Sequence, residues 1–166
     1  MSNHYTTSQI ETMAEKTREK FAVNDGDKLN VVSIAKGLGF TVYNASFDNN
    51  KIAGKVVSDE NEKSIYINKS DTPERKRFTV AHEIGHIVLH HPLDDSPFSK
   101  VDYRGANNTF DRKEWEANRF AAALLMPEEE ARRVWRKTHD VDDFAEAMGV
   151  SKLAGAIRLE VLGLID

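Results

Sequence analysis

The residues best suited to chemistry are the two histidines and the glutamate of the segment His82-Glu83-Ile84-Gly85-His86. Residues four apart share one face of a helix, so His82 and His86 can present ring nitrogens to the same metal ion. Glu83 is rotated about 100° from His82, outside the ligand pair but close to a water beside that ion. The pattern predicts a zinc site with one open position, where the pKa of the water falls to about 7 and Glu83 accepts its proton.

The same spacing also fits a helix that merely buries two hydrogen-bonded histidines. The neighbouring residues are largely apolar, however, and predict a buried helix in which two imidazoles and a carboxylate would be costly without a shared purpose. Gly85, in the middle of this helix, costs about 1 kcal/mol relative to alanine and indicates close approach by another element. Both features favour the metal site.

A third ligand has to come from elsewhere, and because the chain has no cysteine it must be a histidine or a carboxylate. His90 lies about 12 Å along the helix axis from His82, so we expect it to be structural or to support a ligand. The helix expected at 112–126 offers Glu114 and Glu116, at opposite edges of its apolar arc. Periodicity does not choose between them, and a first-turn glutamate is commonly just a solvated charge.

The elements that must position these residues alternate between helical and strand patterns. Helices are predicted at 8–21, 31–38, 73–90, 112–126 and after Pro127, and strands at 40–43, 52–57 and 64–68. The last two strands flank a charged turn and predict a hairpin, one edge of which, at 55–58 or 64–68, is expected to accept an extended peptide. Residues 91–111 lack periodicity and predict a long loop that acts as a lid.

Residues 139–166 have the spacing of a helix-turn-helix, with Gly149 in the turn and Ser151 as the cap of the second helix. This stretch contains six acids and two bases, which argues against direct DNA binding because such binding rests on several phosphate contacts. We expect this tail to be structural or to dock a substrate. Residues 1–166 are predicted to form a single zinc-peptidase domain.

Composition excludes several classes of protein. Hydrophobic residues make up 40% and charged residues 30% of the chain, as in ordinary globular proteins, and the net charge of −4 indicates no general affinity for nucleic acid. The first 21 residues are polar and do not form a signal peptide, and no apolar run is long enough to span a membrane. A cytoplasmic location is therefore expected. The absence of cysteine also weakens a deformylase-like zinc hydrolase, a type that uses a cysteine ligand.

Two segments carry a family resemblance: residues 82–90, H-E-I-G-H-I-V-L-H, and residues 116–127, E-A-N-R-F-A-A-A-L-L-M-P. Together they resemble the ImmA/IrrE family of metallopeptidases, and residues 34–40, 65–68 and 78–81 are similar too. The resemblance implies Glu116 as the third zinc ligand beside His82 and His86. It also implies an α+β, gluzincin-like fold, in which a small twisted sheet packs on an active-site helix and a glutamate-bearing helix and a helical tail follows.

The function that the resemblance implies is that of a zinc-dependent endopeptidase. Its substrate would be a specific protein, a helix-turn-helix repressor of a prophage, mobile element or stress response, encoded nearby. The alternative is a non-proteolytic, zinc-containing module that inactivates a repressor or toxin by binding, but a purely structural site has no need of Glu83. Three residues are candidates to stabilise an oxyanion, because each can donate a hydrogen bond: Tyr66, Tyr103 and His139.

Overall fold

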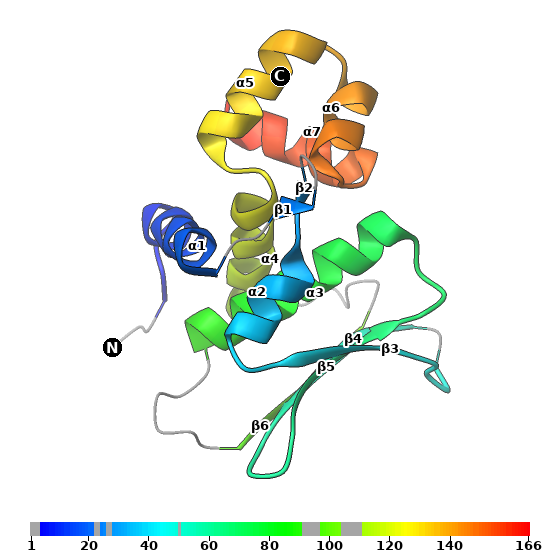
Figure 1. Cartoon of the computed structure of the whole chain (residues 1–166). Coiled ribbons are helices and arrows are strands. Elements are labelled where there is room, and N and C mark those ends of the chain that lie inside the picture. Colours follow the sequence, from blue (N-terminus) through cyan, green and yellow to red (C-terminus); the bar gives the residue numbers. More distant parts are fainter. Residues whose placement is uncertain (1–3, 22–23, 26–27, 50, 91–96, 104–110) are drawn as a thin grey trace.

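The computed structural model describes residues 4–21, 24–25, 28–49, 51–90, 97–103 and 111–166. Within these ranges it contains seven helices and six strands, which confirms the predicted α+β class. Figure 1 shows the helices stacked on one side of the main sheet, with α5, α6 and α7 farthest from it. No helix in these ranges is both long and apolar enough to cross a membrane.

The main sheet has four strands in the order β3-β5-β4-β6. Their bounds are β3 (Thr41–Ala45), β4 (Ile52–Ser58), β5 (Lys63–Asn68) and β6 (Phe98–Tyr103). Strands β4 and β5 form the predicted antiparallel hairpin, and β3 runs parallel to β5. The prediction that this hairpin offers an edge to a peptide is wrong, because β4 also pairs with β6 and β5 also pairs with β3.

Strand β6 lies within the stretch that was predicted to be a long loop. It pairs antiparallel with β4, with Lys55 opposite Val101 and Val57 opposite Ser99. The paired residues of β4 lie at least 40 positions earlier in the chain, so local periodicity did not reveal this pairing. The segments that would form the predicted lid, 91–96 and 104–110, lie outside the described residues.

The helices α3 (Pro73–His90) and α4 (Arg112–Leu125) pack directly against each other and carry most of the candidate site. A Cβ atom at Gly85 would lie 3.1 Å from the carbonyl oxygen and 3.2 Å from the Cα of Ala117 on α4. This contact confirms the predicted close approach. The side chain of Asp111 caps α4 by accepting hydrogen bonds from its first turn.

The amino-terminal elements pack against both α3 and α4. They are α1 (Thr7–Phe21), the two-stranded ribbon of β1 (Asn24–Asp25) and β2 (Lys28–Leu29), and α2 (Val31–Gly37). Helix α1 packs on α4, and α2 packs on α3. The chain before α1 reaches the carboxyl end of α3, where the Tyr5 hydroxyl donates to the carbonyl of Leu89 (2.8 Å).

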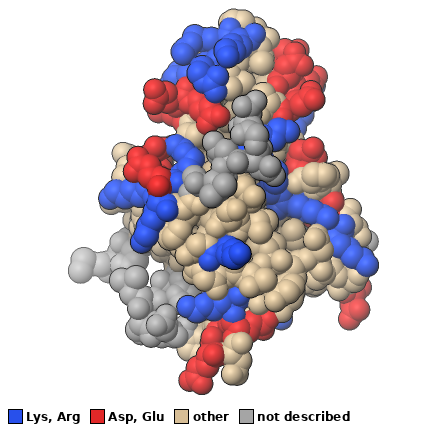
Figure 2. All heavy atoms as spheres, in the orientation of Figure 1, with Lys and Arg blue, Asp and Glu red and all other residues tan. Residues whose placement is uncertain are grey.

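The tail forms α5 (Glu128–Thr138), α6 (Val141–Met148) and α7 (Lys152–Val161). The expected turn lies between α6 and α7, where Gly149 has a φ of 70° and Ser151 caps α7. Arg158 of α7 is buried and binds Glu11 of α1 (2.6 and 3.0 Å) as well as the carbonyl of Met126. On the face shown in Figure 2, charges of both signs are interspersed, without a continuous basic surface among the described residues.

Candidate metal and catalytic site

Four side chains from three elements converge at one point beside the sheet. They are His82 and His86 of α3, Asp102 of β6 and Glu114 of α4, and one potential ligand atom from each lies within 4.8 Å of the others. The Nε2 atoms of His82 and His86 are 3.1 Å apart. Glu114 Oε2 is 2.7 Å from His86 Nε2 and 3.1 Å from His82 Nε2, and Asp102 Oδ1 is 3.4 Å from His82 Nε2.

The opposite ring nitrogen of each histidine is held by a partner outside this group. His82 Nδ1 donates to the side-chain oxygen of Asn118 (2.7 Å), and His86 Nδ1 is 3.0 Å from His90 Nδ1. Because a neutral imidazole carries only one proton, a proton on Nδ1 leaves a lone pair on Nε2. With a metal ion bound, both lone pairs would point at that ion, whereas without one the Nε2 atoms hydrogen-bond to the carboxylate of Glu114.

The negative charges of Asp102 and Glu114 favour a cation at the centre of this group. Burial lowers the pKa of His82, but hydrogen bonds and charge from Asp102 and Glu114 outweigh it and raise the pKa to about 9. Burial lowers the pKa of His86. Although burial opposes it, hydrogen bonds from His82 and His86 hold the pKa of Glu114 well below its usual value. Lys100 Nζ, 2.9 Å from Glu114 Oε1, supplies one cation beside these carboxylates.

This donor set suits a divalent transition metal. Ligands at about 2.0–2.1 Å from a tetrahedral zinc ion lie roughly 3.3 Å from one another. The distances among His82 Nε2, His86 Nε2 and Glu114 Oε2 are 2.7 to 3.1 Å, close to that value. Imidazole nitrogens with a carboxylate oxygen are the ligands of catalytic rather than structural zinc sites. The residues present therefore fit a zinc ion.

Glu83 lies beside the group without a hydrogen bond of its own. Its side chain is fully buried, and within the described part of the chain neither carboxylate oxygen has a hydrogen-bond partner. Its Oε1 is 3.9 Å from His82 Nε2. Burial and the nearby carboxylate of Asp102 raise the pKa of Glu83 well above its usual value. A buried carboxylate is costly to leave unpaired, so Glu83 is better explained by chemistry than by packing.

Glu116 of α4 is not part of the four-residue group. Its carboxylate is 3.0 Å from His90 Nε2 and accepts a hydrogen bond from the backbone N–H of Tyr5 (2.5 Å). Residues two apart on a helix are separated by about 200°, so Glu114 and Glu116 cannot face the same point. Glu114, rather than the predicted Glu116, lies within hydrogen-bond distance of His82 and His86, because the contact between α3 and α4 turns Glu114 toward these two histidines.

Asn118 and Asp102 are among the residues of the site that were not predicted from the sequence. Asn118 had a usable signal, since it lies four residues after Glu114 and shares its face of α4. Asp102 had none, because its place in the site depends on the pairing of β6 with β4. Pairing between strands far apart in sequence is invisible to local patterns.

The predicted oxyanion donors are not brought into this group. The hydroxyl of Tyr66 donates to Glu62, and its ring stacks on Tyr43 at 5.5 Å. His139 ends α5 and lies against Trp135, 5.9 Å between ring centroids. Tyr103 is 63% exposed and follows Asp102 on β6, so the two side chains point to opposite faces of the strand.

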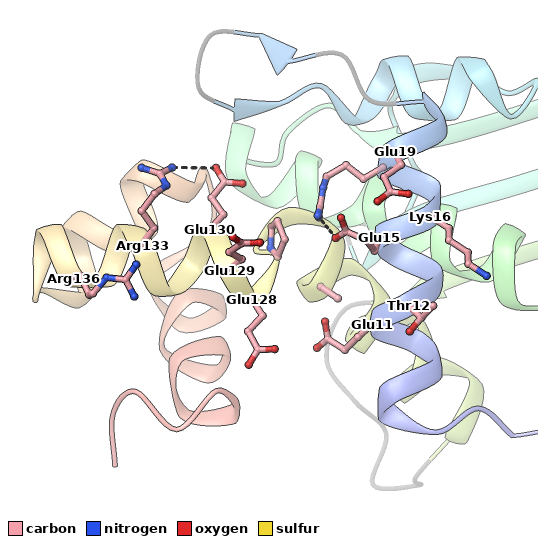
Figure 3. Close-up of a pocket in the computed structure, with 13 residues that line it drawn as sticks. Glu11, Thr12, Glu15, Lys16, Glu19, Glu128, Glu129, Glu130, Arg133 and Arg136 are labelled. Carbon is pink, nitrogen blue, oxygen red and sulfur yellow. Dashed lines mark hydrogen bonds and ion pairs between the residues drawn. The ribbon is translucent and has the colours of Figure 1, made fainter.

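A second concave region lies between α1 and α5 (Figure 3). It is an open groove of about 830 Å³ bordered by glutamates and by basic residues. Some of its charges are paired within the groove, Glu15 with Arg18 and Glu130 with Arg133 at 3.8 Å. No histidine borders the groove among the described residues, so it lacks the donor set of the four-residue group.

Two imidazoles and a carboxylate, with a buried glutamate at the next helical position that has no hydrogen-bond partner in the described part of the chain, are the arrangement expected of a metallopeptidase. Comparison with known proteins agrees with this class. Residues 35–160, more than half of the chain, match the family model described as the IrrE N-terminal-like domain of peptidases. The chain belongs to the ImmA/IrrE family, as its sequence predicted.

Individual relatives match over shorter stretches. Uncharacterized immunity region protein 2 of Bacillus phage phi105 is 33% identical over 100 residues, covering 60% of this chain and 61% of that protein. The radiation response metalloprotease IrrE of Deinococcus radiodurans is 43% identical over 65 residues, 39% of this chain and 19% of that protein. The chain thus spans less than two thirds of the length of either relative.

A solved structure shares the fold. A Mycobacterium tuberculosis transcriptional regulator superposes with a TM-score of 0.62 over 95% of this chain and 48% of that one. Sequence identity is only 16%, so the likeness shows the fold alone.

Proposed function

We propose that this protein is a zinc-dependent endopeptidase with His82, His86 and Glu114 as metal ligands and Glu83 as general base. The observation that carries the proposal is Glu83, which is fully buried beside two converging imidazole Nε2 atoms and has no hydrogen-bond partner among the described residues. A raised pKa makes a carboxylate a stronger base, which suits removal of a proton from water near neutral pH.

Each residue of the site has a distinct role in this proposal. When bound, zinc would polarise a peptide carbonyl and lower the pKa of a water molecule to about 7. Glu83 accepts the proton of the attacking water and delivers it to the leaving amine. Asn118 and His90 hold the Nδ1 protons of the two histidines, which keeps both Nε2 lone pairs directed at the site. Lys100 fixes the second oxygen of Glu114.

The substrate would lie along β6. Within the described residues this strand pairs with β4 in the sheet, and we infer that an extended peptide adds along its other side at 99–102. Asp102 on the same strand belongs to the four-residue group, so a peptide added there would run past the site. This edge replaces the one predicted on the β4–β5 hairpin.

The substrate class is inferred from the relatives. The phage relative carries the name of an immunity region protein, and the bacterial relative that of a metalloprotease. We infer that a transcriptional repressor encoded near this protein's gene is the substrate. Inactivation of that repressor by binding alone, with zinc as a structural element, is the competing function.

The substitution Glu83→Gln tests the proposal. The protein and the variant are loaded with zinc and incubated with each helix-turn-helix repressor encoded next to the gene, and products are read by gel and mass spectrometry. We expect cleavage by the native protein, loss of at least about 100-fold in the variant, and unchanged zinc content. Glu74→Gln, an exposed first-turn position on the same helix, is the matched control. Equal repressor inactivation by Glu83→Gln would support binding without proteolysis instead.

A further inference from the structure

A chain of hydrogen bonds leads away from the candidate metal site to the amino-terminal segment. It runs from His86 Nδ1 to His90 Nδ1 (3.0 Å), from His90 Nε2 to Glu116 Oε1 (3.0 Å), and from Glu116 Oε2 to the backbone N–H of Tyr5 (2.5 Å). The side chains of His86 and Glu116 are 1% exposed and that of His90 is 6% exposed. These polar groups are thus removed from water and depend on one another.

The carboxylate of Glu116 determines which atom is the donor and which is the acceptor in each of these hydrogen bonds. An ionised carboxylate only accepts hydrogen bonds, so His90 must carry its proton on Nε2 to donate to Glu116. The Nδ1 of a neutral His90 is then an acceptor, and the bond from His86 must be donated by His86 Nδ1. When a neutral His86 binds a metal ion, its lone pair is thereby placed on Nε2, the atom that lies 2.7 Å from Glu114 and 3.1 Å from His82 Nε2.

Tyr5 lies at the end of this series of hydrogen bonds farthest from the metal site. Its hydroxyl donates to the carbonyl of Leu89 (2.8 Å), and its ring centroid lies 6.4 Å from that of His90. Arg112 donates to the carbonyl of Tyr5 (2.6 Å) and lies 3.5 Å from Glu116 Oε2. The segment before α1 is therefore anchored at three points over His90 and Glu116, 111 residues away in sequence from the glutamate that it caps.

We propose that His90 and Glu116 are positioning residues that set the tautomer and orientation of His86 for metal binding. The segment at Tyr5 completes this hydrogen-bonded series of His86, His90 and Glu116, which we call the relay. The proposal rests on the metal site of the proposed function and adds residues to it. Outer partners of this kind hold the ring of a ligand histidine in place and raise its basicity. Glu116, predicted from sequence as a ligand, acts here through two histidines rather than on the metal.

Metal affinity separates this role from a purely structural one. Zinc binding is measured by competition with a chelating dye for the native protein, His90→Phe, Glu116→Ala, Glu116→Gln and Tyr5→Ala. Loss of an outer partner typically costs about 10- to 100-fold in metal affinity, and we expect losses in that range for His90→Phe and Glu116→Ala. Glu116→Gln should lose less, because its amide oxygen still accepts from His90.

Two reference variants separate an effect on the relay from a general loss of stability and from the loss of a metal ligand. Glu11→Gln disturbs another buried contact of the same amino-terminal helix, the pair with Arg158, yet touches none of the relay, so its zinc affinity should match the native value. Glu114→Ala removes a proposed ligand and should lose more affinity than Glu116→Ala. The absorption spectrum of bound cobalt(II) should shift in His90→Phe and remain unchanged in Glu11→Gln.

The zinc affinities of these variants distinguish a failure of the relay from a failure of the proposed metal site. Zinc affinities of His90→Phe and Glu116→Ala within about twofold of native, against the 10- to 100-fold expected, would overturn the relay and leave the proposed metal site standing. A larger loss in Glu116→Ala than in Glu114→Ala would also overturn it, by making Glu116 the ligand. Failure of the native protein to bind zinc would instead remove the proposed function on which the relay rests.

Discussion

Substitution of Gly85 by alanine tests whether the contact between α3 and α4 sets the geometry of the site. The new Cβ would lie 3.1 Å from the Ala117 carbonyl oxygen, 3.2 Å from the Ala117 Cα and 3.2 Å from a ring carbon of Phe120. Ordinary carbon contacts are about 3.5–4.0 Å, so α4 must move away by a few tenths of an ångström. Two of the three atoms are backbone and cannot rotate out of the way.

The expected loss of stability follows from two opposed contributions. Overpacking a tight contact costs about 1–3 kcal/mol. Alanine recovers about 1 kcal/mol of helix propensity relative to glycine. The net effect is a loss of about 1 kcal/mol, which at this chain length lowers the melting temperature by about 2–4 °C. Because Glu114 moves with α4, zinc affinity should fall as well.

Urea denaturation and zinc competition measure the two effects. Gly155→Ala is the matched control, since a Cβ there would contact the Ala145 Cβ at 3.2 Å and a ring carbon of Phe144 at 3.4 Å, side-chain atoms remote from the site. We expect this control to be neutral or slightly stabilising, with native zinc affinity. The reasoning is refuted if Gly85→Ala is as stable as Gly155→Ala and binds zinc equally well.

Two further predictions concern pH and the tail. The pKa of His82 is raised from 6.5 to about 9 in the metal-free fold, so its contribution to stability is fully present below pH 6.5 and is lost as pH rises through 9. The melting temperature of metal-free protein should therefore fall over this window, and a flat profile, or the same fall in His82→Gln, would contradict the assignment. Glu11→Gln leaves the buried Arg158 without its carboxylate and should cost about 1–3 kcal/mol in urea denaturation. Glu146→Gln, an exposed control on α6, should cost close to nothing.

Features that depend on neighbours along the chain were predictable. The start of α3 has Pro73 in its first position, with the side chain of Thr72 accepting from the N–H of Arg75. The β4–β5 hairpin is set by its charged turn, and the α6–α7 pair by Gly149 and Ser151. Each rests on hydrogen bonds or backbone preferences within a few residues, which a sequence displays directly.

Contacts between distant segments were not predictable in the same way. Strand β6 forms because β4 pairs with it, so the place of Asp102 and the position of β6 at the edge of the described sheet are products of that pairing. The place of Tyr5 over His90 likewise depends on how α1 packs on α4. Local periodicity reports which face of an element is apolar, but not which element will lie against it.

The sequence by itself determined that His82, Glu83 and His86 share one helix with ligand spacing, because four residues make about one helical turn. It also determined that no cysteine could complete the site. Only the tertiary structure decided which glutamate faces the histidines. That choice depends on the rotation of α4 against α3, which the close contact of Gly85 with Ala117 fixes, and it directs Glu114 to the histidines and Glu116 to His90.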